Sequence, residues 1–77
     1  MIVAITSPAA AHSVALANHA EELRRYHGFT TRGREVPGVI LDALERAARA
    51  HRAACATDAQ YREDLRTLTT RSVSRAA

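Results

Sequence analysis

The sequence has no lysine and no tryptophan, and it holds one cysteine, two prolines and three glycines among its 77 residues. A single cysteine excludes a disulfide within the chain and fits a reducing compartment. No run approaches the ~20 apolar residues that a membrane-spanning helix needs. Pro8 also interrupts the apolar start at residues 1–5 before a signal-peptide core is complete. We therefore expect a soluble, cytoplasmic protein without a membrane partner.

Large apolar side chains are scarce as well, because alanine fills 17 positions and aromatic residues make up only 4% of the chain. Chains this short bury a smaller share of their surface than larger ones, so one copy gains little from burial against its ordering entropy. Alanine faces let helices approach closely, which suits a bundle built from several copies. The composition therefore predicts a homo-oligomer.

Arginine supplies all eleven basic residues, and the formal net charge is +3. Four acidic residues precede an arginine by four positions, which is ordinary pairing on a helix surface: Glu21, Asp42, Glu45 and Asp58. The positive excess lies in residues 28–38 and in the last nine residues. A DNA-associated regulatory protein using Arg32, Arg34, Arg71 and Arg75 is therefore the alternative function, although a helix that reads DNA usually carries its basic stripe itself.

Two alanine-rich amphipathic stretches, residues 7–32 and 37–56, predict an all-α antiparallel helical hairpin. Ser7 followed by Pro8 is a helix start, because a serine hydroxyl accepts from open backbone N–H groups and proline suits the first helical position. The first helix ends at either Gly28 or Gly33, since both are plausible left-handed caps. Its apolar face carries residues spaced by four and three positions: His12, Leu16, His19, Leu23 and Tyr26.

The second helix repeats this spacing, and a third, short helix follows it. Thr57 with Gln60 three positions later resembles a capping box, which starts a helix at about residue 58. Residues 1–68 are therefore expected to form a single domain, with an extended arm at residues 2–5, and residues 69–77 a flexible tail. The side chains expected to form the core and the contacts between copies are Leu16, Leu23, Ile40, Leu41, Leu44, Tyr61, Leu65 and Leu68.

The run from Thr6 to Pro8, the run His19–Tyr26 and the turn Arg32–Pro37 together resemble a helical pair in small proteins of actinobacteria and their phages. In many of those proteins the pair precedes an excisionase-like helix-turn-helix domain. The resemblance covers about residues 5–52, favours Gly33 as the end of the first helix, and implies a phage-like regulatory setting. Within these 77 residues we expect no DNA-reading domain.

Histidines give the sharpest chemical hypothesis. His12 and His19 lie on the inner face of the first helix, while His51 and Cys55 lie four apart on that of the second. A helix end at Gly28 brings His12 near His51 and Cys55, whereas an end at Gly33 brings His19 opposite His51 and leaves His12 nearer Asp58. Either register predicts a group of zinc-type ligands. The competing interpretation is that these histidines are interior or boundary residues, each donating to a carbonyl or to its symmetry mate, and that Cys55 acts as a small buried hydrophobic residue.

Catalysis finds little support in the sequence. His51 and Cys55 lack an orienting group and an oxyanion site, and the evenly spaced glycines are not followed by a lysine, as a phosphate-binding loop would require. We therefore expect no enzyme. The sequence predicts a small helical interaction protein, regulatory and phage-encoded, that acts by self-association and by binding a protein partner.

Overall fold

The computed structural model of this chain describes the backbone of residues 7–76 and the side chains of residues 7–71, so the arm predicted at residues 2–5 lies outside the described part. It contains three helices: α1 (Pro8–Thr31), α2 (Gly38–Ala54) and α3 (Asp58–Ala76). Within residues 7–76 there is no strand. The all-α prediction is confirmed.

Helix α1 begins where the sequence indicated. The Ser7 hydroxyl accepts a hydrogen bond from the Ala10 N–H at 3.1 Å, and Pro8 occupies the first helical position. Serine satisfies one of the open backbone donors, and proline adds none of its own. The start of α1 is therefore fixed by two adjacent residues.

Gly33, not Gly28, ends α1. Gly33 has a φ of 67°, the left-handed conformation that glycine adopts most readily. Its N–H donates to the Thr30 carbonyl at 3.0 Å, and the Arg34 N–H donates to the Phe29 carbonyl at 3.0 Å, so two terminal carbonyls are satisfied. Gly28 lies inside α1. This end point sets which α1 residues face α2.

The predicted cap from Thr57 and Gln60 is present at the start of α3, but Gln60 bonds to the backbone N–H of Ala56, one residue before Thr57, and not to that of Thr57 itself. The Thr57 hydroxyl accepts from the Gln60 N–H at 3.1 Å, and the Gln60 side-chain oxygen accepts in return from the Ala56 N–H at 2.9 Å. This reciprocal pair separates α3 from α2.

Helix α3 differs from its predicted length. It has 19 residues, more than the 17 of α2, and it continues to Ala76 through the stretch for which the sequence predicted a flexible tail. The Thr67 hydroxyl, just before this stretch, and the Thr70 hydroxyl, within it, donate to the carbonyls of Glu63 and Arg66. Polar residues that satisfy their hydroxyls in this way are compatible with a helix.

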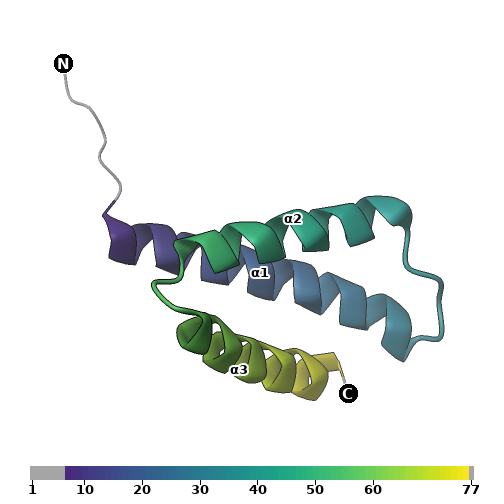
Figure 1. The fold of residues 1–77 in the computed structure, drawn as a ribbon. Helices are drawn as coiled ribbons and strands as arrows, with labels where there is room; N and C mark the ends of the chain where they lie inside the picture. The colour runs from purple at the N-terminus through teal and green to yellow at the C-terminus, as the bar shows by residue number, and fades with distance from the viewer. Residues whose placement is uncertain (1–6, 77) are drawn as a thin grey trace.

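Figure 1 shows α1 lying between the other two helices, with α2 antiparallel to it and α3 on its other side. Helix α1 packs extensively against both, whereas α2 and α3 touch little. Ala47 and Leu68 are the buried hydrophobic residues of the described part. Six predicted core residues are half-buried: Leu16, Leu23, Ile40, Leu44, Tyr61 and Leu65.

Leu41 does not join this core, because 46% of it is exposed. The face of α2 that meets α1 runs through Ile40, Leu44, Ala47 and His51, and one residue along a helix turns the side chain by about 100°. Leu41 was predicted to belong to the core or to the contacts between copies. It lies outside the core of the single chain, and its place in a contact between copies stays a prediction.

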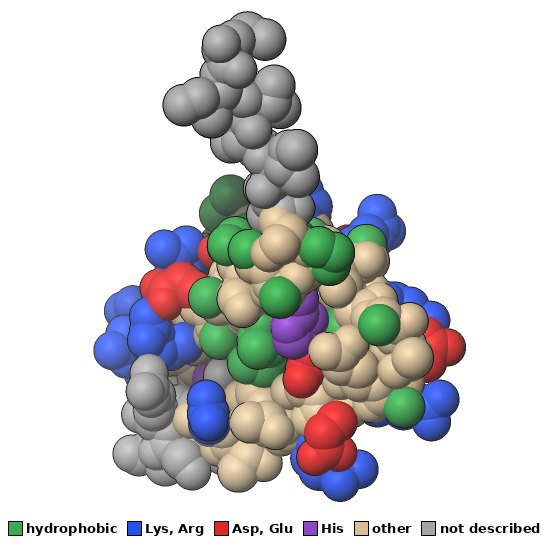
Figure 2. Space-filling model, turned by 90° about the vertical axis from the view of Figure 1, so that its left-hand side faces the viewer, with side chains coloured by type: hydrophobic (Ala, Val, Ile, Leu, Met, Phe, Trp, Pro, Cys, Tyr) green, Lys and Arg blue, Asp and Glu red, His purple; other side chains and the backbone are tan. Residues whose placement is uncertain are grey.

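Three polar residues are buried instead, namely His19, Glu22 and His51, with exposed fractions of 2%, 7% and 0%. Figure 2 views the end of the bundle from which the N terminus leaves, and it shows a histidine surface among apolar side chains with an acidic group beside it. Charged groups surround the sides of this end face.

Because the buried residues of the described part include His19, Glu22 and His51 beside Ala47 and Leu68, the interior of this fold contains polar side chains as much as apolar ones.

The position of the α1 end can be tested with two matched substitutions. Gly33→Ala should destabilise the protein by about 1–2 kcal/mol, because alanine is strained at a positive φ. Gly28→Ala should stabilise it by about 0.5–1 kcal/mol, because Gly28 is inside a helix and an added Cβ meets nothing within 4 Å. Urea unfolding measures both, and equal effects of the two changes would contradict the assigned end.

Candidate metal centre

Four side chains that can each offer a metal ligand meet near one end of the bundle. His12 comes from α1, His51 from α2, Cys55 from the residue that ends α2, and Asp64 from α3. Their ligand atoms all lie within 4.8 Å of one another. All three helices therefore contribute to a single point.

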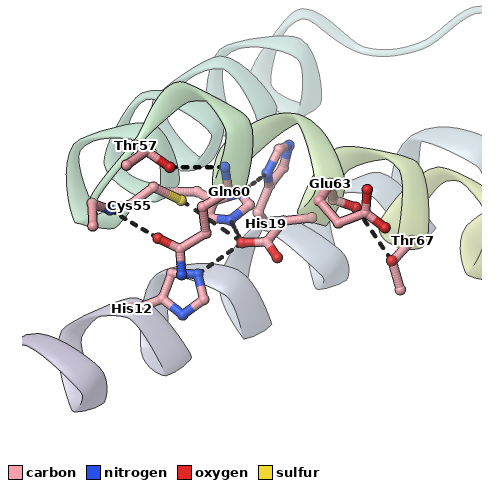
Figure 3. A network of polar contacts seen from close by, with 10 residues as sticks. His12, His19, Cys55, Thr57, Gln60, Glu63 and Thr67 are labelled. Carbon is pink, nitrogen blue, oxygen red and sulfur yellow. Dashed lines mark hydrogen bonds and ion pairs between the residues drawn. The ribbon is translucent and has the colours of Figure 1, made fainter.

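The carboxylate of Asp64 is the centre of this group. His12 Nε2 lies 2.7 Å and His51 Nε2 lies 2.9 Å from the same oxygen, Asp64 Oδ2. The Cys55 thiol donates to this oxygen at 3.7 Å. Figure 3 shows dashed lines that leave His12 and Cys55 in different directions, and these lines mark the contacts of the two residues with Asp64. A carboxylate without a proton accepts only, so each of these partners points a donor toward it.

His51 is held by its neighbours on several sides. Its ring is fully buried, and its centroid lies 5.7 Å from that of His12, 5.1 Å from that of His19 and 5.0 Å from that of Tyr61. His51 Nδ1, which does not face Asp64, lies 2.9 Å from His19 Nδ1. Both ring nitrogens of His51 are therefore engaged, and the ring has one defined orientation.

The protonation of the cluster follows from these contacts. The hydrogen bond from His51 lowers the pKa of Asp64, with a further contribution from His12, although burial opposes this shift. Burial, and then the negative charge of Asp64, raises the pKa of the Cys55 thiol. Burial, and then His51, lowers the pKa of His19. At neutral pH Asp64 is a carboxylate, Cys55 is a thiol and His19 is neutral.

This set of donors suits a divalent transition metal. Two imidazole nitrogens, one sulfur and one carboxylate oxygen are ligands that Zn²⁺ takes, whereas Mg²⁺ and Ca²⁺ prefer oxygen alone. Tetrahedral zinc, with bonds of about 2.0–2.3 Å, separates its ligand atoms by roughly 3.3–3.8 Å. The two histidine contacts to Asp64 Oδ2, at 2.7 and 2.9 Å, are shorter than that range, and the Cys55 contact, at 3.7 Å, lies within it. Small outward movements of the histidine side chains would therefore admit the ion.

An open hollow of about 330 Å³ lies beside His12, which is the one candidate ligand that lines it. Pro8, Ala9, Ala54 and Gln60 also line it. The His12 and Asp64 side chains are each 20% exposed, so the outer edge of the cluster is accessible while His51 stays covered. An ion can therefore reach the site without unfolding of the helices.

The structure brings together three of the four histidine and cysteine residues predicted as ligands, namely His12, His51 and Cys55. His19 lies outside this group and contacts His51 instead, as predicted for a helix end at Gly33. In that register His12 was expected nearer Asp58, and this was wrong, because His12 lies with His51 and Cys55, the grouping that was predicted for a helix end at Gly28.

Sequence reasoning missed Asp64. Asp64 lies three residues after Tyr61 and four before Leu68, on the face of α3 that was predicted to be inward. The position of this carboxylate on an inward face could have predicted Asp64 as a ligand. The prediction did not include Asp64 because the face was defined by its apolar residues alone.

The arginines proposed for DNA binding do not gather at one place. Arg32 and Arg34 are exposed in the connection between α1 and α2, whereas Arg71 is exposed on α3 beside Ala17 and Ala20 of α1. Twelve residues of helix, about 18 Å, separate Ala20 from Arg32. The side chain of Arg75 lies outside the described part. Residues 7–71 therefore form no single surface from these arginines.

The sequence matches no protein-family model, and no curated protein and no solved structure matches it either. Among the described helices, none combines the length and the apolar character needed to cross a bilayer.

The lowered pKa of His19 predicts a loss of stability in acid. Because the unfolded chain binds a proton at this residue near pH 6.5 and the folded chain binds it only at lower pH, the stability from neutral His19 is complete above pH 6.5. It is lost as the pH falls from 6.5 toward the folded pKa, by at most about 1.4 kcal/mol per pH unit. Urea unfolding with a chelator present, at pH 7.5 and pH 5, measures this loss.

His19→Gln is the reference variant, because glutamine does not titrate. The wild type should lose more free energy of unfolding between the two pH values than His19→Gln does. An equal or smaller loss in the wild type would contradict this cause.

Proposed function

We propose that this chain is a small non-enzymatic helical module that binds one divalent transition metal ion, zinc, through His12, His51, Cys55 and Asp64. The observation that supports this most directly is that donors from all three helices lie within 4.8 Å of one another. All four tetrahedral positions would be filled by protein side chains. Such closed sites are structural, whereas catalytic zinc keeps an open position for water or substrate.

A metal at this position would compensate for the small apolar core. Ala47 and Leu68 are the buried hydrophobic residues of the described part, and α3 contacts α2 little. Asp64 on α3 would share an ion with His51 and Cys55 of α2, and small domains with limited cores often depend on a metal in this way. The ion would therefore tie α3 to the α1–α2 hairpin.

Zinc binding should be visible in native mass spectrometry and in thermal unfolding. The chain should retain one ion per copy. At a free zinc concentration about 100 times Kd, the ion should add about 2.7 kcal/mol, which raises Tm by on the order of 10–20 °C for a domain of this size. A chelator should reverse the change. If no ion is retained and Tm does not move on zinc addition, the proposed function fails.

Substitution of single candidate ligands tests which side chains bind the ion. Cys55→Ser and His12→Gln remove one donor each from the accessible side of the cluster and should weaken zinc binding strongly. His27→Gln is the matched control, because His27 lies on α1 about 22 Å along the helix from His12. With Co²⁺ as a probe, the sulfur-to-metal absorption band should be absent in Cys55→Ser and unchanged in His27→Gln.

A second candidate is the interaction role expected from composition, with a second copy of this chain as the partner. An open hollow of about 380 Å³ lies between α1 and α3. The apolar residues Leu16, Ala17, Ala20 and Leu68 line it together with the polar residues Ser13, Asp64, Thr67 and Arg71. Val14 and Val39 are each 68% exposed, and Leu41 is 46% exposed. Apolar surface on so small a domain favours association with a like surface. A regulatory role in a phage-like setting remains part of this proposal.

Self-association should be measured by analytical ultracentrifugation of the zinc-loaded chain. The wild type should form a dimer or higher oligomer, and Ala17→Arg should reduce it to a monomer, because it places a charge in the hollow between α1 and α3. Ala50→Arg introduces the same side chain at an exposed position of α2 and should leave the assembly intact. A wild type that stays monomeric at high concentration would contradict this candidate.

A further inference from the structure

We propose that His19 is a positioning residue for the metal site, and that zinc binding reverses the direction of the hydrogen bond between His19 and His51. This inference rests on the proposed function. It assigns a role to a buried histidine that is not one of the four candidate ligands. It also explains why two imidazoles face each other in the interior.

The contact between the two rings requires one shared proton. His19 Nδ1 and His51 Nδ1 are 2.9 Å apart, and the residues are 2% and 0% exposed, so water does not compete there. Two unprotonated nitrogens at this distance would repel each other, and so would two N–H groups. One ring therefore donates and the other accepts.

Without the ion, Asp64 determines which ring donates. Asp64 Oδ2 lies 2.9 Å from His51 Nε2, and a carboxylate accepts only, so Nε2 of His51 carries the proton. In a neutral His51 the other nitrogen, Nδ1, is then an acceptor. His19 must therefore be protonated at Nδ1 and donate to His51.

With zinc bound, His51 must donate to His19 instead of accepting from it. Zinc binds the lone pair of His51 Nε2, so the proton of the neutral ring lies on Nδ1 and is donated to His19 Nδ1. His19 becomes the acceptor, and its own proton moves to Nε2. His12 changes tautomer in the same way when its Nε2 binds the ion. Each ring keeps one proton, and the thiol proton of Cys55 leaves to solvent as the zinc–sulfur bond forms.

His19 suits both states because an imidazole can donate or accept at the same nitrogen. A carboxylate in its place would accept from zinc-bound His51 but would have nothing to donate to metal-free His51. Partners of this kind fix the orientation of a metal-bound histidine and raise its basicity, and losing one typically costs about 10–100-fold in metal affinity. His19 is thus expected to set the affinity of the site without touching the ion.

The direct test is NMR of the ¹⁵N-labelled full chain at pH 7.5, where long-range ¹H–¹⁵N correlations identify each histidine tautomer. His19 should be protonated at Nδ1 in the presence of a chelator and at Nε2 with one equivalent of zinc. The inference is overturned if zinc binds and His19 keeps one tautomer throughout. Failure of the proposed function is a separate outcome, seen as no zinc retained in native mass spectrometry, and it removes this inference as well.

Substitution gives the second readout, by competition with a zinc-binding indicator. His19→Leu removes both donor and acceptor and should weaken zinc binding about 10–100-fold. His19→Asn places an amide near the position of Nδ1, which can donate or accept, and should recover most of the loss. His27→Leu should have no effect. A folded His19→Leu variant with wild-type affinity overturns the inference, and if that variant does not fold, the NMR tautomers decide.

Discussion

The arrangement of this protein depends on the hydrogen bonds that the Asp64 carboxylate accepts. One of its oxygen atoms contacts His12 from α1, His51 from α2 and Cys55 from the end of α2. Helix α3, which contacts α2 little, is thereby tied to both other helices. The position of α3 therefore follows from where its carboxylate finds donors as well as from burial of Leu68.

A polar interior is costly in a chain with so small an apolar core. His19 and His51 each lose their hydration, and they regain hydrogen bonds only because the partners lie at the correct distance. Glu22 adds a further cost, because Arg25 bonds one of its oxygens and the other has no partner among the described residues. An ion held by the cluster would offset these costs. Because the site exists only in the folded chain, the free energy of metal binding would add to the free energy of folding.

The sequence predicted the starts of α1 and α3, and the end of α1 as one of two alternatives, because these signals are local, whereas it placed the end of α3 too early. Ser7 with Pro8, Gly33, and Thr57 with Gln60 each act through bonds to backbone groups within a few residues. The packing between the helices could be predicted less well from the sequence. Leu41 fits the same spacing as Leu44, and only the rotation of α2 against α1 decides between the two. The partner of His12 depends on where α3 lies, which no local pattern specifies, so Asp58 was expected where Asp64 is found.

X-ray absorption at the zinc edge of the metal-loaded chain tests the central claim most directly, because it reports the atoms bound to the ion. The account predicts four ligands, with one sulfur at about 2.3 Å and three nitrogen or oxygen atoms at about 2.0–2.2 Å. A first shell without sulfur, or one made of six oxygen atoms, would contradict it.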